Sequence, residues 1–221
     1  MPGTRKHRLC GRPGGEHAPA MPKLYDCLDS GNGYKPRLLL RLLGVSFERI
    51  ELDIEHGASH TAEFLRKNPD GRIPVLELDD GTHLFESNAI LHYLAEGTPY
   101  LPADRLTRSL VLQWMFWEQY SHEPNIAVLR HWTLHGGLTP DRKALVDQKR
   151  ALGERALSVM EAHLGRQRWF VGDGCTIADL ALYAYTHVAP EGGFDLWSLP
   201  AIRTWLDRVR DRPGFTPITE P

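Results

Sequence analysis

The pattern of expected secondary structure changes near residue 97 of this 221-residue chain, which implies two unlike halves. Before residue 97, short apolar runs with strand composition alternate with helical patterns. We predict strands at 23–26, 45–53, 75–78 and 83–85, and helices at about 34–43, 62–65 and 87–96. The order strand, helix, strand, helix, strand, strand, helix predicts an α/β domain over residues 21–97.

Beyond a Gly- and Pro-containing linker, predicted at residues 98–105, the sequence shows helical spacing and no convincing strand. A long helix is expected where apolar residues recur along one face, at Leu106, Leu110, Trp114 and Trp117. Further helices are expected at about 140–164, 177–184 and 202–209. We therefore predict that residues 106–221 form an all-α domain.

Composition excludes several classes of protein. Hydrophobic residues make up 42% and charged residues 24% of the chain, which are globular values, and a net charge of −2 gives no reason to expect a nucleic-acid partner. Cys10, Cys27 and Cys175 follow neither a disulfide nor a zinc pattern, so we expect no metal and a reducing, cytoplasmic location. No apolar run approaches the roughly 18 residues that span a membrane, so no membrane partner is expected.

Residues 1–20, basic and rich in Gly, are predicted to be a disordered tail or an extension from an upstream start codon.

Two short motifs in the α/β half suit a peptide ligand. Pro74 opens a predicted strand, where its missing N–H is tolerated, and a cis Ile73-Pro74 bond would turn the backbone of Ile73 toward an extended ligand. Ser87 is the expected N-cap of the next helix, whose free N–H groups suit a carboxylate. Glu86 stands beside it and can accept from an ammonium group. The pair predicts a site for a small peptide with a free α-amino acid end.

These motifs resemble the glutathione site of the cytosolic glutathione S-transferase family, with its Val/Ile-Pro and its Glu/Gln-Ser before a helix. A third motif, the capping box Thr176-Ile177-Ala178-Asp179, is similar to the Ser/Thr-x-x-Asp box of the family's sixth helix. The resemblance covers about residues 22–215. It implies a thioredoxin-like N-terminal domain, a helical C-terminal domain, glutathione as co-substrate and a homodimer.

The chemical task implied by the resemblance is to stabilise a thiolate. Lowering a thiol pKa by two units requires about 2.7 kcal/mol, which one hydrogen-bond donor and a helix N-terminus can supply. Ser30-Gly31-Asn32-Gly33 has turn composition and looks like the Thr-Pro-Asn-Gly loop of the bacterial nu class. Carried over, Ser30 and then Asn32 are the candidate catalytic residues. Cys27, as in cysteine-type members, and Tyr25, as in tyrosine-type members, rank below them.

Other contacts are expected on both sides of the site. Arg72 and His60 are candidates for the glycyl carboxylate of glutathione. Tyr120 and Arg130, in an aromatic-rich segment of the helical half, are candidates for a pocket that takes a hydrophobic electrophile.

The resulting hypothesis is a glutathione transferase that conjugates hydrophobic electrophiles. The alternatives are glutathione-dependent reduction of disulfides or peroxides, suggested by the nu-like loop, and a non-catalytic binding protein. An isomerase of the zeta type is less favoured, because Ser30-Gly31-Asn32 replaces the Ser-Ser-Cys run of that class.

Overall fold

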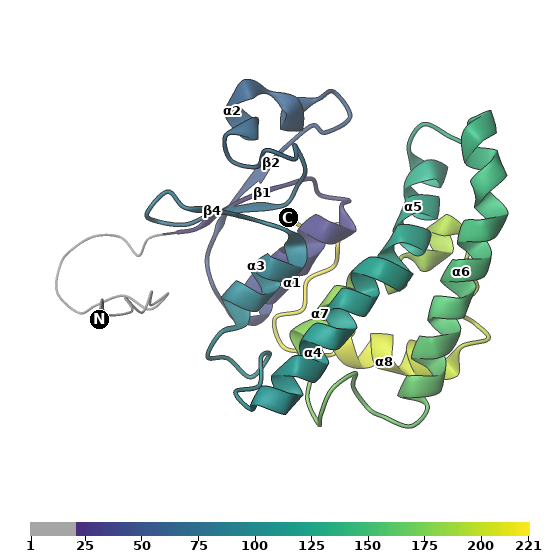
Figure 1. Cartoon of the computed structure of the whole chain (residues 1–221). Helices are drawn as coiled ribbons and strands as arrows, with labels where there is room; N and C mark the ends of the chain where they lie inside the picture. Colours follow the sequence, from purple (N-terminus) through teal and green to yellow (C-terminus); the bar gives the residue numbers. More distant parts are fainter. Residues whose placement is uncertain (1–20) are drawn as a thin grey trace.

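A four-stranded sheet forms the centre of the N-terminal half in the computed structural model, which describes residues 21–221 (Figure 1). The strand order is β2-β1-β3-β4, with β2 parallel to β1 and with β3 and β4 antiparallel to their neighbours. The strands are β1 (Lys23–Asp26), β2 (Glu48–Glu51), β3 (Val75–Glu77) and β4 (His83–Phe85). This sheet confirms the predicted thioredoxin-like fold. The prediction for residues 1–20 lies outside the described residues.

Successive residues of β1 face opposite sides of the sheet, and each side has its own core. Leu24 joins the main core beneath α1 (Gly31–Leu42) and α3 (Ser87–Ala95), which pack against each other. Tyr25 instead packs with Phe64 of α2 (Ala62–Leu65) in a small second cluster. Figure 1 shows α2 on the side of the sheet away from α1 and α3.

Helices form the rest of the described chain, as predicted. They are α4 (Arg105–Trp117), α5 (Glu123–Leu134), α6 (Pro140–Leu164), α7 (Ile177–Thr186) and α8 (Pro200–Arg210). Helix α7 is buried along its whole length and packs against α1 and α4. The predicted capping box at its start is present, and Asp179 also accepts from the indole Nε1–H of Trp205 at 3.0 Å.

The predicted long helix near residue 106 differs from the structure in its buried face and in the segment that follows it. Leu106 and Leu110 are exposed, while Val111 and Met115 are the buried residues of α4. A five-residue π-turn, Glu118–His122, then joins α4 to α5 without a loop. The π-turn holds one residue more per turn than an α-helix, so α5 presents a different face from the one that α4 would have continued.

The C-terminal residues return to the N-terminal half and pack on α1. The Tyr34 hydroxyl donates to the carbonyl of Thr216 at 2.6 Å, and Arg37 Nη2 donates to the carbonyl of Ile218 at 2.9 Å. This return ties the first helix to the last segment of the chain.

Glu77 at the end of β3 gathers polar groups from neighbouring elements. It accepts from the Tyr25 hydroxyl at 2.7 Å and from Lys23 and Lys67 at 3.2 Å each. The Tyr25 hydrogen bond, followed by those of the lysines, lowers the pKa of the Glu77 carboxyl to about 2, although partial burial opposes the shift.

We predict that this carboxylate makes part of the stability dependent on pH. A carboxyl whose pKa is lower in the folded chain stabilises it above the unfolded pKa and loses that effect as the pH falls toward the folded value. Urea unfolding of wild type and Glu77→Gln should therefore differ most at neutral pH and converge between pH values of about 4.5 and 2. A constant difference over this range would contradict the assignment.

Candidate functional site

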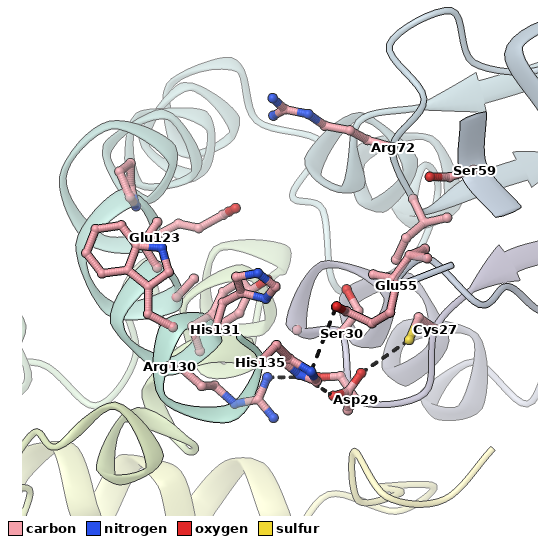
Figure 2. A pocket seen from close by; sticks show the side chains of 18 of the residues that line it. Cys27, Asp29, Ser30, Glu55, Ser59, Arg72, Glu123, Arg130, His131 and His135 are labelled. Carbon is pink, nitrogen blue, oxygen red and sulfur yellow. Dashed lines mark hydrogen bonds and ion pairs between the residues drawn. The ribbon is translucent and has the colours of Figure 1, made fainter. Parts of the chain in front are cut away.

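A cavity of about 400 Å³ lies between the first turn of α1 and helix α5 (Figure 2). Its N-terminal wall comes from the start of α1 and from the segments around Glu55 and Ile73. Its other wall comes from α5. The residues that line it are Cys27, Asp29, Ser30, Gly31, Ile54, Glu55, Ser59, Gly71, Arg72, Ile73, Glu123, Pro124, Ala127, Val128, Arg130, His131, Trp132, His135 and Tyr185.

Ser30 lies in this cavity as the N-cap of α1. Its Oγ accepts from the backbone N–H of Gly33 at 3.2 Å, which leaves its hydroxyl proton free to donate. The predicted loop at 30–33 was wrong, because Gly31, Asn32 and Gly33 form the first turn of α1. The helix N-terminus therefore lies closer to Ser30 than expected, and its partial positive charge favours a nearby anion.

The two glycines of this turn are required by close packing. A Cβ on Gly31 would collide with the ring of Tyr185 from α7, and a Cβ on Gly33 would collide with the carboxylate of Asp26. Asp26 is itself buried and paired with Arg37 at 2.5 Å. Burial raises the pKa of Asp26 to about 7, against the opposing effect of Arg37. The first turn of α1 thus lies directly against a buried ion pair and the helical half.

Asn32 connects three parts of the chain and does not line the cavity. Its Nδ2 donates to Glu123 Oε1 at 2.7 Å, its Oδ1 accepts from the Ser87 hydroxyl at 3.1 Å, and its backbone N–H donates to the Tyr185 hydroxyl at 3.2 Å. Asn32, one of the two predicted catalytic residues, therefore links the start of α3, where the γ-glutamyl end of the ligand was predicted to bind, to helices α5 and α7 of the C-terminal half.

Behind Asn32 lies a buried ionic cluster that joins α1 to the π-turn and α5. Lys35 Nζ is 3.0 Å from Glu118 Oε1 and 3.3 Å from Glu123 Oε2, and its side chain is fully buried. Asn88 and Gln119 also donate to Glu118, so the carboxylate oxygens have several partners.

Two carboxyl groups in this cluster share one ammonium group. Burial raises the pKa of Glu118 to about 7, with Lys35 opposing it. Burial would also raise the pKa of Glu123, but Lys35 and the Asn32 hydrogen bond outweigh it and hold that pKa low. Glu123, which faces the cavity, therefore keeps its negative charge and its hold on Asn32.

Glu86 and Ser87 stand at the start of α3, with one correction to the prediction. The helix begins at Ser87, so the N-cap is Glu86, and the Ser87 hydroxyl is used by Asn32 instead of capping the helix. Glu86 has φ = 69°, the one positive φ among the non-glycine residues from 21 to 221. Such backbone strain in a side-chain-bearing residue is typical of functional sites.

The Ile73-Pro74 bond is cis, as the sequence suggested, and Ile73 lines the cavity. Arg72, next to it, is exposed and pairs with Asp70 at 3.0 Å, and Figure 2 shows its side chain extending over the cavity. His60 does not line the cavity itself, but its ring occupies the space that a Cβ on Gly71, a lining residue, would need.

Cys27 and Tyr25, the lower-ranked candidates, are both in positions that disfavour an anion. Burial and the hydrogen bond from Cys27 Sγ to Asp29, at 3.2 Å, raise the pKa of the Cys27 thiol to about 12. The Tyr25 hydroxyl is used by Glu77, and its ring packs on Phe64, away from the cavity lining.

The two candidates for a second-substrate pocket differ in position. Arg130 lines the cavity, donates through Nε to Glu191 at 2.6 Å and through Nη1 to the carbonyl of Asp29 at 2.8 Å. Tyr120, in the π-turn, is 86% exposed and does not line the cavity.

The sequence interpretation missed the polar residues around His135 at the edge of the cavity. His135 Nε2 lies 3.0 Å from Asp29 Oδ2, and its Nδ1 lies 3.8 Å from Glu55 Oε1. Its ring stacks on that of His131, with centroids 5.2 Å apart. The i, i+4 spacing of these two histidines was the available signal, because it puts both on one helical face.

Within the described part of the chain, no group of three or more His, Cys, Asp or Glu side chains is arranged to hold a metal ion. The same residues include no helix long and apolar enough to cross a membrane.

Comparison with known proteins gives matches over both halves. The family model "Glutathione S-transferase, N-terminal domain" matches residues 21–96, and "Glutathione S-transferase, C-terminal domain" matches residues 114–213. The disulfide-bond oxidoreductase YfcG of Escherichia coli (strain K12) is 31% identical over 83% of this chain and 87% of its own.

Solved structures of other proteins also match most of this chain. A glutathione S-transferase from Pseudomonas fluorescens Pf-5 is 50% identical, with a TM-score of 0.88, over 90% of this chain and all of that one. The glutathione transferase URE2P8 of Phanerochaete chrysosporium, solved with oxidized glutathione, is 26% identical, with a TM-score of 0.78, over 90% and 93% of the two chains.

We predict that Lys35→Met costs about 3–5 kcal/mol of stability, because it leaves Glu118 and Glu123 buried without their cation. Adding Glu118→Gln should restore part of the loss by removing one of the two negative charges. Urea unfolding at neutral pH measures both effects. Lys23→Met, which removes a partly exposed lysine paired with Glu77, is the matched control and should cost far less. Equal losses in the two lysine variants would refute the buried cluster's importance.

Proposed function

Because the chain belongs to the glutathione S-transferase family, we propose that it binds glutathione and activates its thiol for attack on hydrophobic electrophiles. The observation that carries this proposal is Ser30, which lines the cavity at the N-terminus of a twelve-residue helix with its hydroxyl proton uncommitted. A hydroxyl donor and a helix N-terminus both stabilise a thiolate more than a thiol.

Glutathione would be held by the residues around the cis Ile73-Pro74 bond and the start of α3. We propose that the backbone of Ile73 pairs with the cysteinyl part of the peptide. Ser87 and the N–H groups of α3 would take the γ-glutamyl carboxylate, and Glu86 its ammonium group. Arg72 would meet the glycyl carboxylate, with His60 as the more distant candidate.

We propose that Asn32 contributes to the site by positioning neighbouring residues. Its amide has partners in Ser87 and Glu123, and Asn32 does not line the cavity, so its side chain would act by holding these partners in place. We propose that Ser30 is the main donor and that Asn32 aligns the carboxylate end of the site with it.

The second substrate would lie against α5. Arg130 is the predicted contact that the cavity supports, and Trp132 adds an aromatic surface beside it. Tyr120 lies outside this cavity, so a contact between Tyr120 and the second substrate would require another binding surface.

We further propose a cytoplasmic homodimer, as the resemblance implies. Apolar side chains on β4 and α4, including Phe85, Leu106 and Phe116, are exposed and would suit a dimer contact.

Glutathione-dependent disulfide or peroxide reduction is the second candidate, favoured by the likeness to an Escherichia coli disulfide-bond oxidoreductase. Burial and the hydrogen bond to Asp29 raise the pKa of the Cys27 thiol, which disfavours Cys27 as the attacking thiolate, and in this scheme two glutathione molecules would supply both electrons. A non-catalytic glutathione-binding role is the third candidate, because the fold alone does not establish activity.

Three measurements separate these candidates: retention on immobilised glutathione, turnover of 1-chloro-2,4-dinitrobenzene, and reduction of a glutathione mixed disulfide. Retention with turnover of the chloride supports the transferase. Retention with turnover of only the disulfide supports the reductase, and retention alone supports a binding role. Absence of all three would refute the proposal.

We predict that Ser30→Ala raises the pKa of the bound glutathione thiol by about one to two units, since a hydrogen bond to a charged group contributes about 1.5–3 kcal/mol. The ultraviolet absorbance of the thiolate, followed during a pH titration of the complex, measures the shift. Ser30→Thr keeps a hydroxyl and should stay close to wild type. If Ser30→Ala and Asn32→Ala both leave the thiol pKa unchanged, the catalytic assignment is wrong.

A further inference from the structure

The hydroxyl of Tyr185 carries a proton that no group among residues 21–221 accepts. Tyr185 lies near the end of α7, lines the cavity and is 8% exposed. Its hydroxyl oxygen accepts from the backbone N–H of Asn32 at 3.2 Å. A phenolic hydroxyl can donate one hydrogen bond in addition to accepting. The donor is therefore available to a ligand in the cavity.

Two hydroxyls from different halves of the chain meet the first turn of α1. Ser30 Oγ accepts from the N–H of Gly33, and the Tyr185 hydroxyl accepts from the N–H of the neighbouring Asn32, each at 3.2 Å. These are N–H groups that have no acceptor within their own helix. The ring of Tyr185 also lies against Gly31, where an added Cβ would come within 2.4 Å of Cε1. Both hydroxyls therefore belong to the same end of the cavity.

The surroundings keep the proton on Tyr185. Burial, followed by the negative charge of Glu123, raises the pKa of Tyr185 far above its ordinary value, although the Asn32 N–H opposes the shift. The Glu123 carboxylate does not take the phenolic proton, since its hydrogen bonds come from Asn32, Lys35 and Gln119. Because hydrogen bonds in a chain polarise one another, the N–H that Tyr185 accepts strengthens its O–H as a donor.

We propose that Tyr185 is a second catalytic residue of this cavity, whose hydroxyl donates to the glutathione thiolate beside that of Ser30. This inference rests on the proposed binding and activation of glutathione. It adds a residue of the helical half to a thiol site that the sequence placed in the α/β half alone. The Asn32 N–H at the start of α1 then acts on the sulfur through the phenol, and the packing of α7 against α1 sets the thiol pKa.

The test measures the pKa of the bound glutathione thiol in the full-length protein, from the ultraviolet absorbance of the thiolate. Tyr185→Phe keeps the ring and removes the donor, so the thiol pKa should rise by about one unit. Tyr183→Phe is the matched control, because Tyr183 lies on the same helix and does not line the cavity. It should leave the thiol pKa unchanged.

Two further measurements separate donation to the sulfur from support of the helix start. S-methylglutathione cannot form a thiolate, so wild type and Tyr185→Phe should bind it equally well. Replacement of Tyr185 by 3-fluorotyrosine makes the hydroxyl a stronger donor and a weaker acceptor. The single fluorine can take the ring edge away from Gly31. This variant should lower the thiol pKa below that of wild type.

Each other outcome overturns the inference. An unchanged thiol pKa in Tyr185→Phe would exclude donation to the sulfur, and the proposed function would stand on Ser30. Weaker binding of S-methylglutathione by Tyr185→Phe, or a raised thiol pKa with 3-fluorotyrosine, would show that Tyr185 only holds Asn32 in place. If wild type binds no glutathione, the proposed function fails together with the inference.

Discussion

The ionic cluster of Lys35, Glu118 and Glu123 is the interaction on which the arrangement of the site depends. It joins the first helix of the α/β half to the π-turn and α5, and those are the two segments between which the cavity lies. An ion pair of this kind gives little net stability, since its desolvation cost offsets much of the Coulomb attraction. Its effect is on geometry: Lys35 keeps Glu123 ionised and in place, and Glu123 in turn accepts from the Asn32 amide.

Close packing around the start of α1 adds a second constraint. Gly31 admits the ring of Tyr185 from α7, and the hydroxyl of the same tyrosine accepts from the Asn32 backbone. Gly33 admits the carboxylate of Asp26, whose partner Arg37 also holds the C-terminal residues. The segment that would handle the thiol is therefore fixed by groups from the beginning, middle and end of the chain, which leaves it little freedom to adjust to a ligand.

The sequence predicted the α/β half well, because its signals are local. Apolar runs bounded by Pro74 and by the Asp-Gly turn at 80–81 marked β3 and β4, and α2 and α6 were predicted within a residue of their observed bounds. The error at 30–33 arose because glycine was interpreted as a turn residue, whereas here it is required by a tyrosine more than 150 residues away. No local pattern carries that information.

The residues of α5 that line the cavity could not be predicted from the sequence, for a different reason. The aromatic residues of the helical half were recognised, but which of them face the cavity depends on the rotation of α5 about its axis, and that rotation follows from the π-turn at Glu118–His122. Arg130 was among the predicted contacts, whereas the selection of His131 and His135 would have required the helical face to be known.

The π-turn also has a consequence for how this chain can diverge. Each residue in an α-helix corresponds to roughly 100° of rotation, so insertion or deletion of one residue in Glu118–His122 would turn all of α5 by that amount. A different set of side chains would then face Ser30, and Glu123, the first residue of α5, would turn away from Asn32 and Lys35. Variation in length at this turn would thus exchange the second-substrate surface and loosen the support of the peptide-binding half in one step.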